Sequence, residues 1–188
     1  MVDKKFKLTK EIKEDYGIVF HRIEALKDFS NVKKGDKGGW LEKEENLSQE
    51  GNAWVFGDAE VYGDARVYGN AWVFDNARVY GNARVYGNAW VFDNARVYGN
   101  ARVYGDARVY GNARVYGDAE VYGNARVYGD AEVYGDAEVY GDARVEDVKL
   151  CSKYSYESNE QIELWLKKEK EYEEEVNNID TKVDSNKR

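Results

Sequence analysis

Few side chains of this sequence could carry out catalytic or metal chemistry, and they lie far apart in the chain. Its 188 residues include one histidine, His21, and one cysteine, Cys151. A histidine can act as a general base, and both residue types bind zinc, but a zinc site needs three or four such ligands close together. The glycines of the repeat recur about every six residues and open no helix, so they form no phosphate-binding loop. The sequence therefore predicts no catalytic residue, no metal site and no cofactor.

Large aromatic side chains form a second candidate site, for binding rather than catalysis. Three tryptophans and three phenylalanines recur every eighteen residues. They are Trp54, Trp72, Trp90, Phe56, Phe74 and Phe92. At the same spacing, the tryptophan column continues as Arg108 and Arg126. Because an exposed group of large apolar rings usually marks an interface, we expect these residues to form a contact surface.

A hexapeptide repeat that runs from Gly51 to Val145 must position these side chains. Its unit is Gly-(Asn/Asp)-Ala-X-Val-(Tyr/Phe), and residues 70–87 are identical to residues 88–105. Side chains alternate along an extended chain, so alanine and valine share one face while X and the aromatic residue share the other. Glycine followed by Asn or Asp favours a corner, because these residues tolerate positive φ. Three hexads in each eighteen-residue turn predict a three-sided parallel β-helix.

The segments on either side of the repeat differ from it in composition. Residues 1–50 contain strand-like stretches and a glycine-rich turn, and they predict a small β-rich cap over the open end of the solenoid. The repeat region extends over residues 51–148. Residues 149–188 form a charged tail, in which we expect a helix over residues 158–178. The fold is therefore expected to be an all-β solenoid with one C-terminal α-helix.

The predicted tail helix carries an apolar stripe. Its members are Ile162, Trp165, Leu166, Tyr172 and Val176. The helix would be about 31 Å long at 1.5 Å per residue, close to the length expected for the solenoid. It could therefore lie along the rod against the tryptophans, or join copies of the chain into a coiled coil or another homo-oligomer, a dimer or a trimer. For this reason we include Trp165 and Tyr172 in the expected contact surface.

Composition and charge narrow the class of protein. No N-terminal segment resembles a signal peptide and no apolar run approaches membrane-spanning length, which predicts a cytoplasmic protein with no membrane partner. Arginines interleaved with tyrosines suit single-stranded nucleic acid, yet the net charge of −8 argues against it. The acidic stretch 117–145 leaves open the opposite role, a rod that mimics nucleic acid. A protein is therefore the expected partner, and nucleic acid is not.

The repeat and the segment before it also resemble a known family. Val-Tyr-Gly-Asn-Ala-Arg fits the hexapeptide pattern of left-handed parallel β-helices, in which a small residue follows an aliphatic one by four positions. The stretch from Ala25 to Ser48, which includes Lys-Gly-Asp-Lys-Gly-Gly-Trp-Leu, resembles the N-terminal module of YdcK-like hexapeptide-repeat proteins of bacteria and prophages. The resemblance covers about residues 5–145. It implies a left-handed β-helix, a transferase-like family label and an association with phages.

These observations lead to one expected function and three competing ones. We expect a non-enzymatic β-solenoid that binds a host or viral protein as an interaction or scaffolding module, with the phage association taken from the resemblance. The first competing function is that of a hexapeptide-type acyltransferase. Such enzymes work as trimers with a histidine base, whereas His21 lies outside the repeats here. The second is a rod that binds or mimics nucleic acid, and the third is a glycan-binding or tail-fibre component that uses its aromatic rings as stacking platforms.

Overall fold

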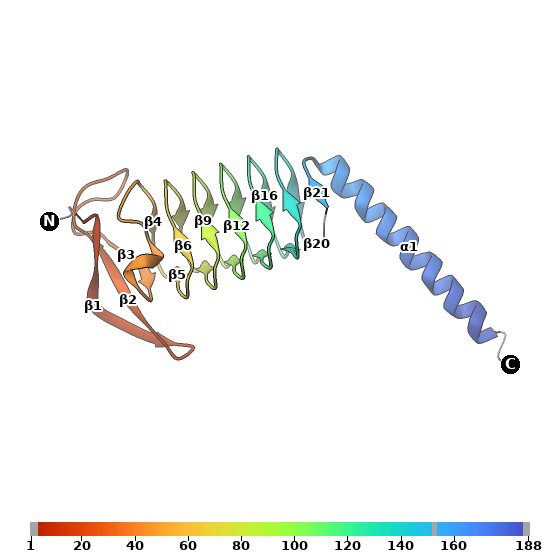
Figure 1. Ribbon diagram of the computed structural model, residues 1–188, viewed down its shortest axis with the longest axis horizontal. Helices are drawn as coiled ribbons and strands as arrows, with labels where there is room; N and C mark the ends of the chain where they lie inside the picture. Colours follow the sequence, from red (N-terminus) through yellow and green to blue (C-terminus); the bar gives the residue numbers. More distant parts are fainter. Residues whose placement is uncertain (1–3, 152–153, 186–188) are drawn as a thin grey trace.

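The computed structural model describes residues 4–151 and 154–185, and within them the chain forms a three-sided rod followed by a helix (Figure 1). The rod begins with an antiparallel hairpin of β1 (Phe6–Asp15) and β2 (Ile18–Ala25). Strand β2 pairs antiparallel with β3 (Lys37–Leu41), and β3 pairs parallel with a strand of the first full coil. The N-terminal cap therefore continues one sheet of the solenoid and is not joined to it by a linker.

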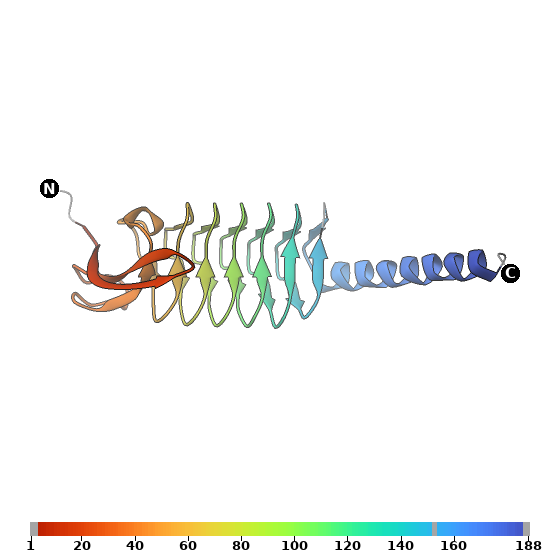
Figure 2. The same cartoon turned by 90° about the horizontal axis from the view of Figure 1, so that it is seen from below.

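Three parallel sheets run along the rod, one on each side of the coils (Figure 2). Side one consists of β4 (Trp54–Val55), β7 (Trp72–Val73), β10 (Trp90–Val91), β13 (Arg108–Val109), β16 (Arg126–Tyr128) and β19 (Arg144–Glu146). Side two consists of β5 (Glu60–Val61), β8 (Arg78–Val79), β11 (Arg96–Val97), β14 (Arg114–Val115), β17 (Glu132–Tyr134) and β20 (Lys149–Cys151). Side three consists of β6 (Arg66–Val67), β9 (Arg84–Val85), β12 (Arg102–Val103), β15 (Glu120–Val121), β18 (Glu138–Val139) and β21 (Ser155–Tyr156). The predicted three-sided parallel solenoid is confirmed, with about six turns.

Alanine and valine fill the interior of every coil, as the alternation of side chains predicts. Val97 on β11 is 0% exposed and lies in register between Val79 and Val115 of the neighbouring coils. The residue before it, Arg96, is exposed. Because every coil repeats this arrangement, the core is a narrow column of small aliphatic side chains along the axis of the rod.

The corners between sides require backbone of positive φ, and they stack closely on one another. Gly87 has a φ of 70°, and a Cβ atom added there would lie 2.9 Å from the backbone nitrogen of Gly105 in the next coil. At two corners of side one an aspartate takes the place of glycine, with φ values of 59° for Asp75 and 58° for Asp93. The sequence pattern of glycine followed by Asn or Asp thus corresponds to the turns of the solenoid.

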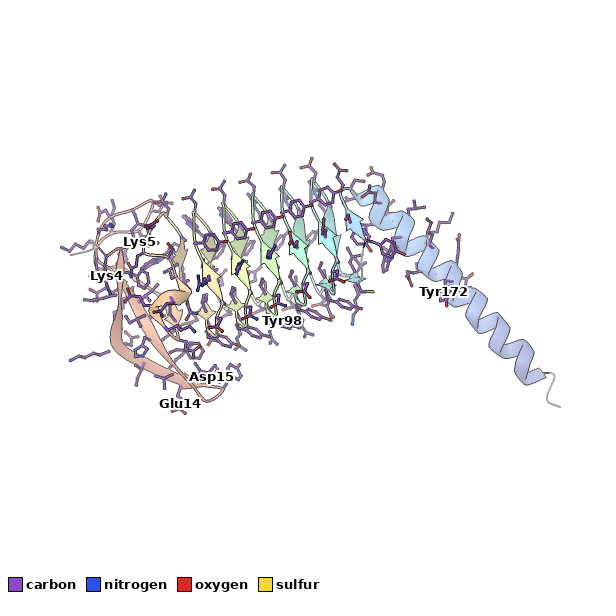
Figure 3. The ribbon with its side chains drawn as sticks, viewed as in Figure 1. Lys4, Lys5, Glu14, Asp15, Tyr98 and Tyr172 are labelled. Carbon is purple, nitrogen blue, oxygen red and sulfur yellow. The ribbon has the colours of Figure 1, made fainter. Side chains whose placement is uncertain are left out.

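The cap closes the N-terminal end of the core with a short 3-10 helix and a buried lysine. The helix η1 (Glu44–Asn46) leads into Leu47, which bridges to Val67 on side three. Lys5, labelled in Figure 3, is 1% exposed. Its Nζ donates to the backbone oxygen of Ala53 at 2.8 Å. Burial, followed by the nearby charge of Lys27, lowers the pKa of this amine to about 8. The cap therefore satisfies backbone groups that the first coil would otherwise leave unpaired.

The C-terminal helix α1 (Asn159–Ser185) does not lie along the rod. The expectation that it would pack along the rod against the tryptophans is therefore wrong. Strands β20 and β21 continue the solenoid beyond the hexad pattern, and α1 then leaves the last coil and points away from it (Figures 1 and 2). The physical reason is that Ile162, which is 5% exposed, joins the end of the core. The side chain of Val176 lies outside the described part of the structure. Within the described residues, no helix combines the length and hydrophobicity needed to cross a membrane.

Candidate functional site

The aromatic column on side one was predicted to be a contact surface, but its first member is buried. Trp54 is 1% exposed and packs edge-on against Phe6 and Phe29 of the cap, with ring centroids 6.2 and 5.3 Å apart. Phe56 turns toward Trp72, with a centroid distance of 5.2 Å. The cap therefore removes Trp54 from the exposed surface, because the long N-terminal chain folds over the first coil.

The remaining rings of side one form an ordered row at the surface. Trp72 and Trp90 are half-buried and stacked, with centroids 5.6 Å apart, and Phe74 and Phe92 are stacked at 4.7 Å. The guanidinium of Arg108 lies 4.8 Å from the centroid of the Trp90 ring, which is a cation–π contact. The row thus has the register that the eighteen-residue spacing predicts, with a cation at its C-terminal end.

A shallow apolar hollow of about 300 Å³ opens on this row. Its lining consists of Phe56, Gly57, Trp72, Phe74, Asp75 and Trp90. None of these residues is a histidine, cysteine, serine or lysine, so the hollow provides apolar contact and one carboxylate but no nucleophile. Its role as a contact surface stays a prediction.

The other predicted contact residues lie apart from this row. Arg126 is in register with Arg108 on the next coil of side one. Trp165 packs edge-on against Tyr156 at the end of the last coil, with centroids 6.0 Å apart. Tyr172 is 66% exposed and projects from α1 (Figure 3). The structure therefore divides the predicted surface between side one and the C-terminal end of the rod.

His21, which the sequence placed outside the repeats, is held as an oriented imidazole. It is half-buried on β2, in register with Ile12 of β1 and Leu41 of β3. Its Nδ1 lies 3.3 Å from the backbone oxygen of Thr9. A carbonyl oxygen can only accept a hydrogen bond, so Nδ1 carries a proton, and in the neutral ring Nε2 then keeps the free lone pair. A general base needs a ring nitrogen that is free to accept a proton and a contact that orients the ring, and the neutral His21 has both.

The single cysteine belongs to no metal site in the described structure. Cys151 is half-buried on β20, and its hydrogen bond with Tyr134 raises the pKa of that phenol. Among the described residues, no group of three or more His, Cys, Asp or Glu side chains could hold a metal ion. Within the described residues, neither Cys151 nor His21 therefore belongs to a cluster of metal ligands.

Stacked tyrosines on sides two and three have raised pKa values, and this predicts how stability depends on pH. Burial raises the pKa of Tyr62, Tyr116 and Tyr122 to about 12 in each case, and hydrogen bonds to glutamates add to the effect for Tyr116 and Tyr122. Because the folded state favours the neutral phenol, its stabilisation is complete below the ordinary tyrosine pKa near 10. It is lost as pH rises from about 10 toward 12. We expect tyrosinate absorbance and circular dichroism to change together in that range, whereas full ionisation near pH 10 without unfolding would contradict this.

Side three, which carries none of the predicted site residues, has two adjoining hollows. One of about 550 Å³ lies against the cap, and a second of about 470 Å³ continues along the coils. Arg66 and Arg84 line both hollows. One feature of the sequence could have indicated these hollows, because the hexad pattern is lost before Gly51. As a result Ser48, and not an aromatic residue, lies one coil before Tyr68 on this side.

Comparison with known proteins matches the coils to a family of repeats. Residues 59–75, 77–93, 95–109, 107–121 and 119–135 match the family model described as the YdcK Beta solenoid repeat. A protein of Escherichia coli (strain K12) named as the uncharacterized acetyltransferase YdcK is 41% identical to this chain over 39 residues. The alignment covers 21% of this chain and 12% of the relative. The matched region is therefore a small part of that protein.

This similarity corrects the function expected from the sequence. A non-enzymatic interaction or scaffolding module was expected, but the relative that matches is named as an acetyltransferase. The expectations of a scaffold and of no enzymatic activity are therefore wrong, and the acyltransferase function is better supported. The association with phages, the cytoplasmic location and the protein partner stay predictions.

Proposed function

We propose that this chain, five segments of which match the YdcK Beta solenoid repeat, is an acyltransferase in which His21 is the general base. The observation that carries the proposal is the contact of the His21 Nδ1 with the Thr9 carbonyl, which leaves Nε2 unprotonated in the neutral ring. The name of the relative supports an acetyl group as the group transferred.

The proposed reaction moves an acyl group from a thioester to an amine or a hydroxyl group. The acceptor attacks the carbonyl carbon, and Nε2 of His21 takes the proton that the acceptor loses. The carbon–sulfur bond then breaks, and the imidazolium returns the proton to the departing sulfur. Positioned proton transfer of this kind contributes about 10²- to 10⁴-fold to a rate.

The hairpin that carries His21 is anchored to the rod, so the imidazole sits on a rigid element. Lys13 of β1 forms an ion pair with Glu60 of side two, with Nζ 2.7 Å from Oε1. Glu60 is 4% exposed, so the carboxylate of this pair is shielded from solvent, whereas the Lys13 side chain is partly exposed. Phe20 packs edge-on against Tyr62, with centroids 5.4 Å apart. These contacts fix the hairpin on side two, and a fixed support is what a general base needs for efficient proton transfer.

A thiol-release assay tests the proposal. The intact chain is mixed with acetyl-coenzyme A and a panel of amines and hydroxyl compounds, and free thiol is measured over time. We expect turnover that His21→Gln lowers about 10²-fold or more in kcat. Arg144→Gln is the control, because Arg144 is exposed on the last coil and far along the chain from the hairpin. Absence of turnover with every acceptor, or equal rates for the intact chain and His21→Gln, would show that the proposal is wrong.

A further inference from the structure

On side three, tyrosine rings of successive coils stack in a column, and no ring stacks on the N-terminal side of its first member, Tyr68, among the described residues. Tyr68 stacks on Tyr86 with centroids 4.8 Å apart, and Tyr86 stacks on Tyr104 at 4.9 Å. One coil earlier, the backbone nitrogen of Ser48 donates to the oxygen of Val67 at 2.9 Å. Tyr68 makes the equivalent bond in the next coil. Ser48 therefore occupies the position that precedes Tyr68 in the column, with a hydroxymethyl group in place of a ring.

At the corresponding position of side two, the cap does supply an aromatic ring. There the column begins at Tyr62, which stacks on Tyr80 with centroids 4.9 Å apart. Phe20 of the hairpin meets Tyr62 edge-on at an interplanar angle of 88°, so an aromatic ring of the cap closes that column. Among the described residues, no ring stands in this relation to Tyr68 on its N-terminal side.

A hollow of about 550 Å³ lies where the missing ring of side three would be. Its lining consists of Glu45, Ser48, Arg66, Val67, Tyr68 and Arg84. One wall is therefore the aromatic face of Tyr68, and another is formed by two arginines. The neighbouring hollow of about 470 Å³ extends past the same two arginines. A planar ring stacked on Tyr68 would thus have cationic groups beside it.

The two arginines at this hollow have acidic residues nearby but are in no direct ion pair among the described residues. Arg66 and Arg84 are exposed and face each other in register on adjacent strands, about 4.8 Å apart in the backbone. Neither forms an ion pair within the part of the chain that the structure describes. In contrast, Arg102 on the following strand pairs with Glu120 at 2.9 Å. Asp64, whose carboxylate pairs with Lys43, and Asp118 also line the neighbouring hollow. The two adjacent guanidinium groups still repel each other, and a phosphate that accepts from both would relieve that repulsion.

From this arrangement we infer that side three holds a binding site for a nucleoside phosphate. The base stacks on Tyr68 and continues the tyrosine column into the hollow, and the phosphate accepts hydrogen bonds from Arg66 and Arg84. Glu45 supplies a carboxylate on the same hollow, which suits the exocyclic amino group of adenine. A free nucleotide and the nucleotide end of coenzyme A share this chemistry. The second source would connect the site with the proposed acyl transfer, but the site does not depend on that activity.

Calorimetric titration of the intact chain tests the inference without any catalytic readout. We expect AMP to bind saturably, and adenosine and inorganic phosphate to bind at least tenfold more weakly, because each lacks one half of the recognised group. Arg84→Gln should weaken AMP binding at least tenfold. Ser48→Tyr should abolish it, because the new ring would fill the hollow. Arg96→Gln is the matched control, an exposed arginine on side two, and it should bind AMP like the unaltered chain.

Coenzyme A distinguishes the two sources of the nucleotide. Binding of coenzyme A at least tenfold tighter than AMP would support the site with the acyl donor as its ligand, and equal or weaker binding would support it with a free nucleotide. No saturable binding of either ligand at millimolar concentration would overturn the inference. Unchanged AMP binding by folded Ser48→Tyr, with folding checked by circular dichroism, would also overturn it. The thiol-release assay is independent of these outcomes, so the two proposals can fail separately.

Discussion

Replacing Val97 with aspartate is expected to destabilise the solenoid by more than about 4 kcal/mol, enough to unfold the coils around it. Val97 is 0% exposed and lies between Val79 and Val115, inside a column of alanine and valine side chains. A carboxylate there would lose its hydration and find only aliphatic neighbours. Thermal unfolding followed by circular dichroism measures the loss.

The neighbouring residue provides the control for this change. Arg96→Ala alters an exposed side chain on the same strand, and we expect it to cost less than about 1 kcal/mol. The two substituted residues are adjacent in sequence, but their side chains lie on opposite faces of the same strand. Similar losses of melting temperature would mean that the interior and exterior faces had been assigned the wrong way round.

The architecture of the coils could be predicted because the sequence repeats without interruption. The identity of residues 70–87 and 88–105 requires residues eighteen apart to be equivalent, and Trp72 and Trp90 do pair directly across adjacent strands. The substitution of Asp75 for glycine keeps the positive φ of the corner. Local pattern and tertiary structure agree throughout this region because each coil has the same neighbours above and below.

The ends of the rod were harder to predict, because there the hexad pattern no longer indicates register. The solenoid continues to Tyr156, since Leu150 and Tyr156 take interior positions beside Val133 and Val139 of the previous coil. The sequence after Val145 does not keep the six-residue spacing, so this extension was missed. The helix that follows closes the end of the core and does not lie on side one, because Ile162 joins the core and Trp165 packs against Tyr156 of the last coil.

The candidate sites depend on where the cap folds, and a single repeat contains no information about that. The hairpin turns back over side two and brings Phe20 to Tyr62, while on side three Ser48 leaves Tyr68 without a preceding ring. His21 could be found in the sequence, but its contact with Thr9 depends on the pairing of the two hairpin strands. Sequence spacing therefore identified the columns but not which members are exposed.

The cap gives two tryptophans of the same column very different energetic roles. Trp54→Ala is expected to cost about 3–5 kcal/mol, because it removes a side chain that is 1% exposed and leaves a cavity between the cap and the first coil. Trp90 is half-buried, stacked on Trp72 and covered in part by Arg108. We expect Trp90→Ala to cost about 1–2 kcal/mol, since it loses one stacked ring contact, one edge-on contact with Phe74 and one cation–π contact but opens no closed cavity.

Both tryptophans are followed by Val and Phe, so the sequence alone predicts the same loss of stability for the two substitutions. Thermal or urea unfolding of the two single variants, followed by circular dichroism, separates the contribution of the cap from that of the stack. A larger loss for Trp54→Ala, accompanied by release of the hairpin in hydrogen exchange, is the result that cap packing requires. Equal losses would mean that Trp54 is no more buried than Trp90, and that the cap does not fold over side one. The difference between the variants therefore measures how strongly the N-terminal chain is bound to the first coil, which also holds the hairpin that presents His21.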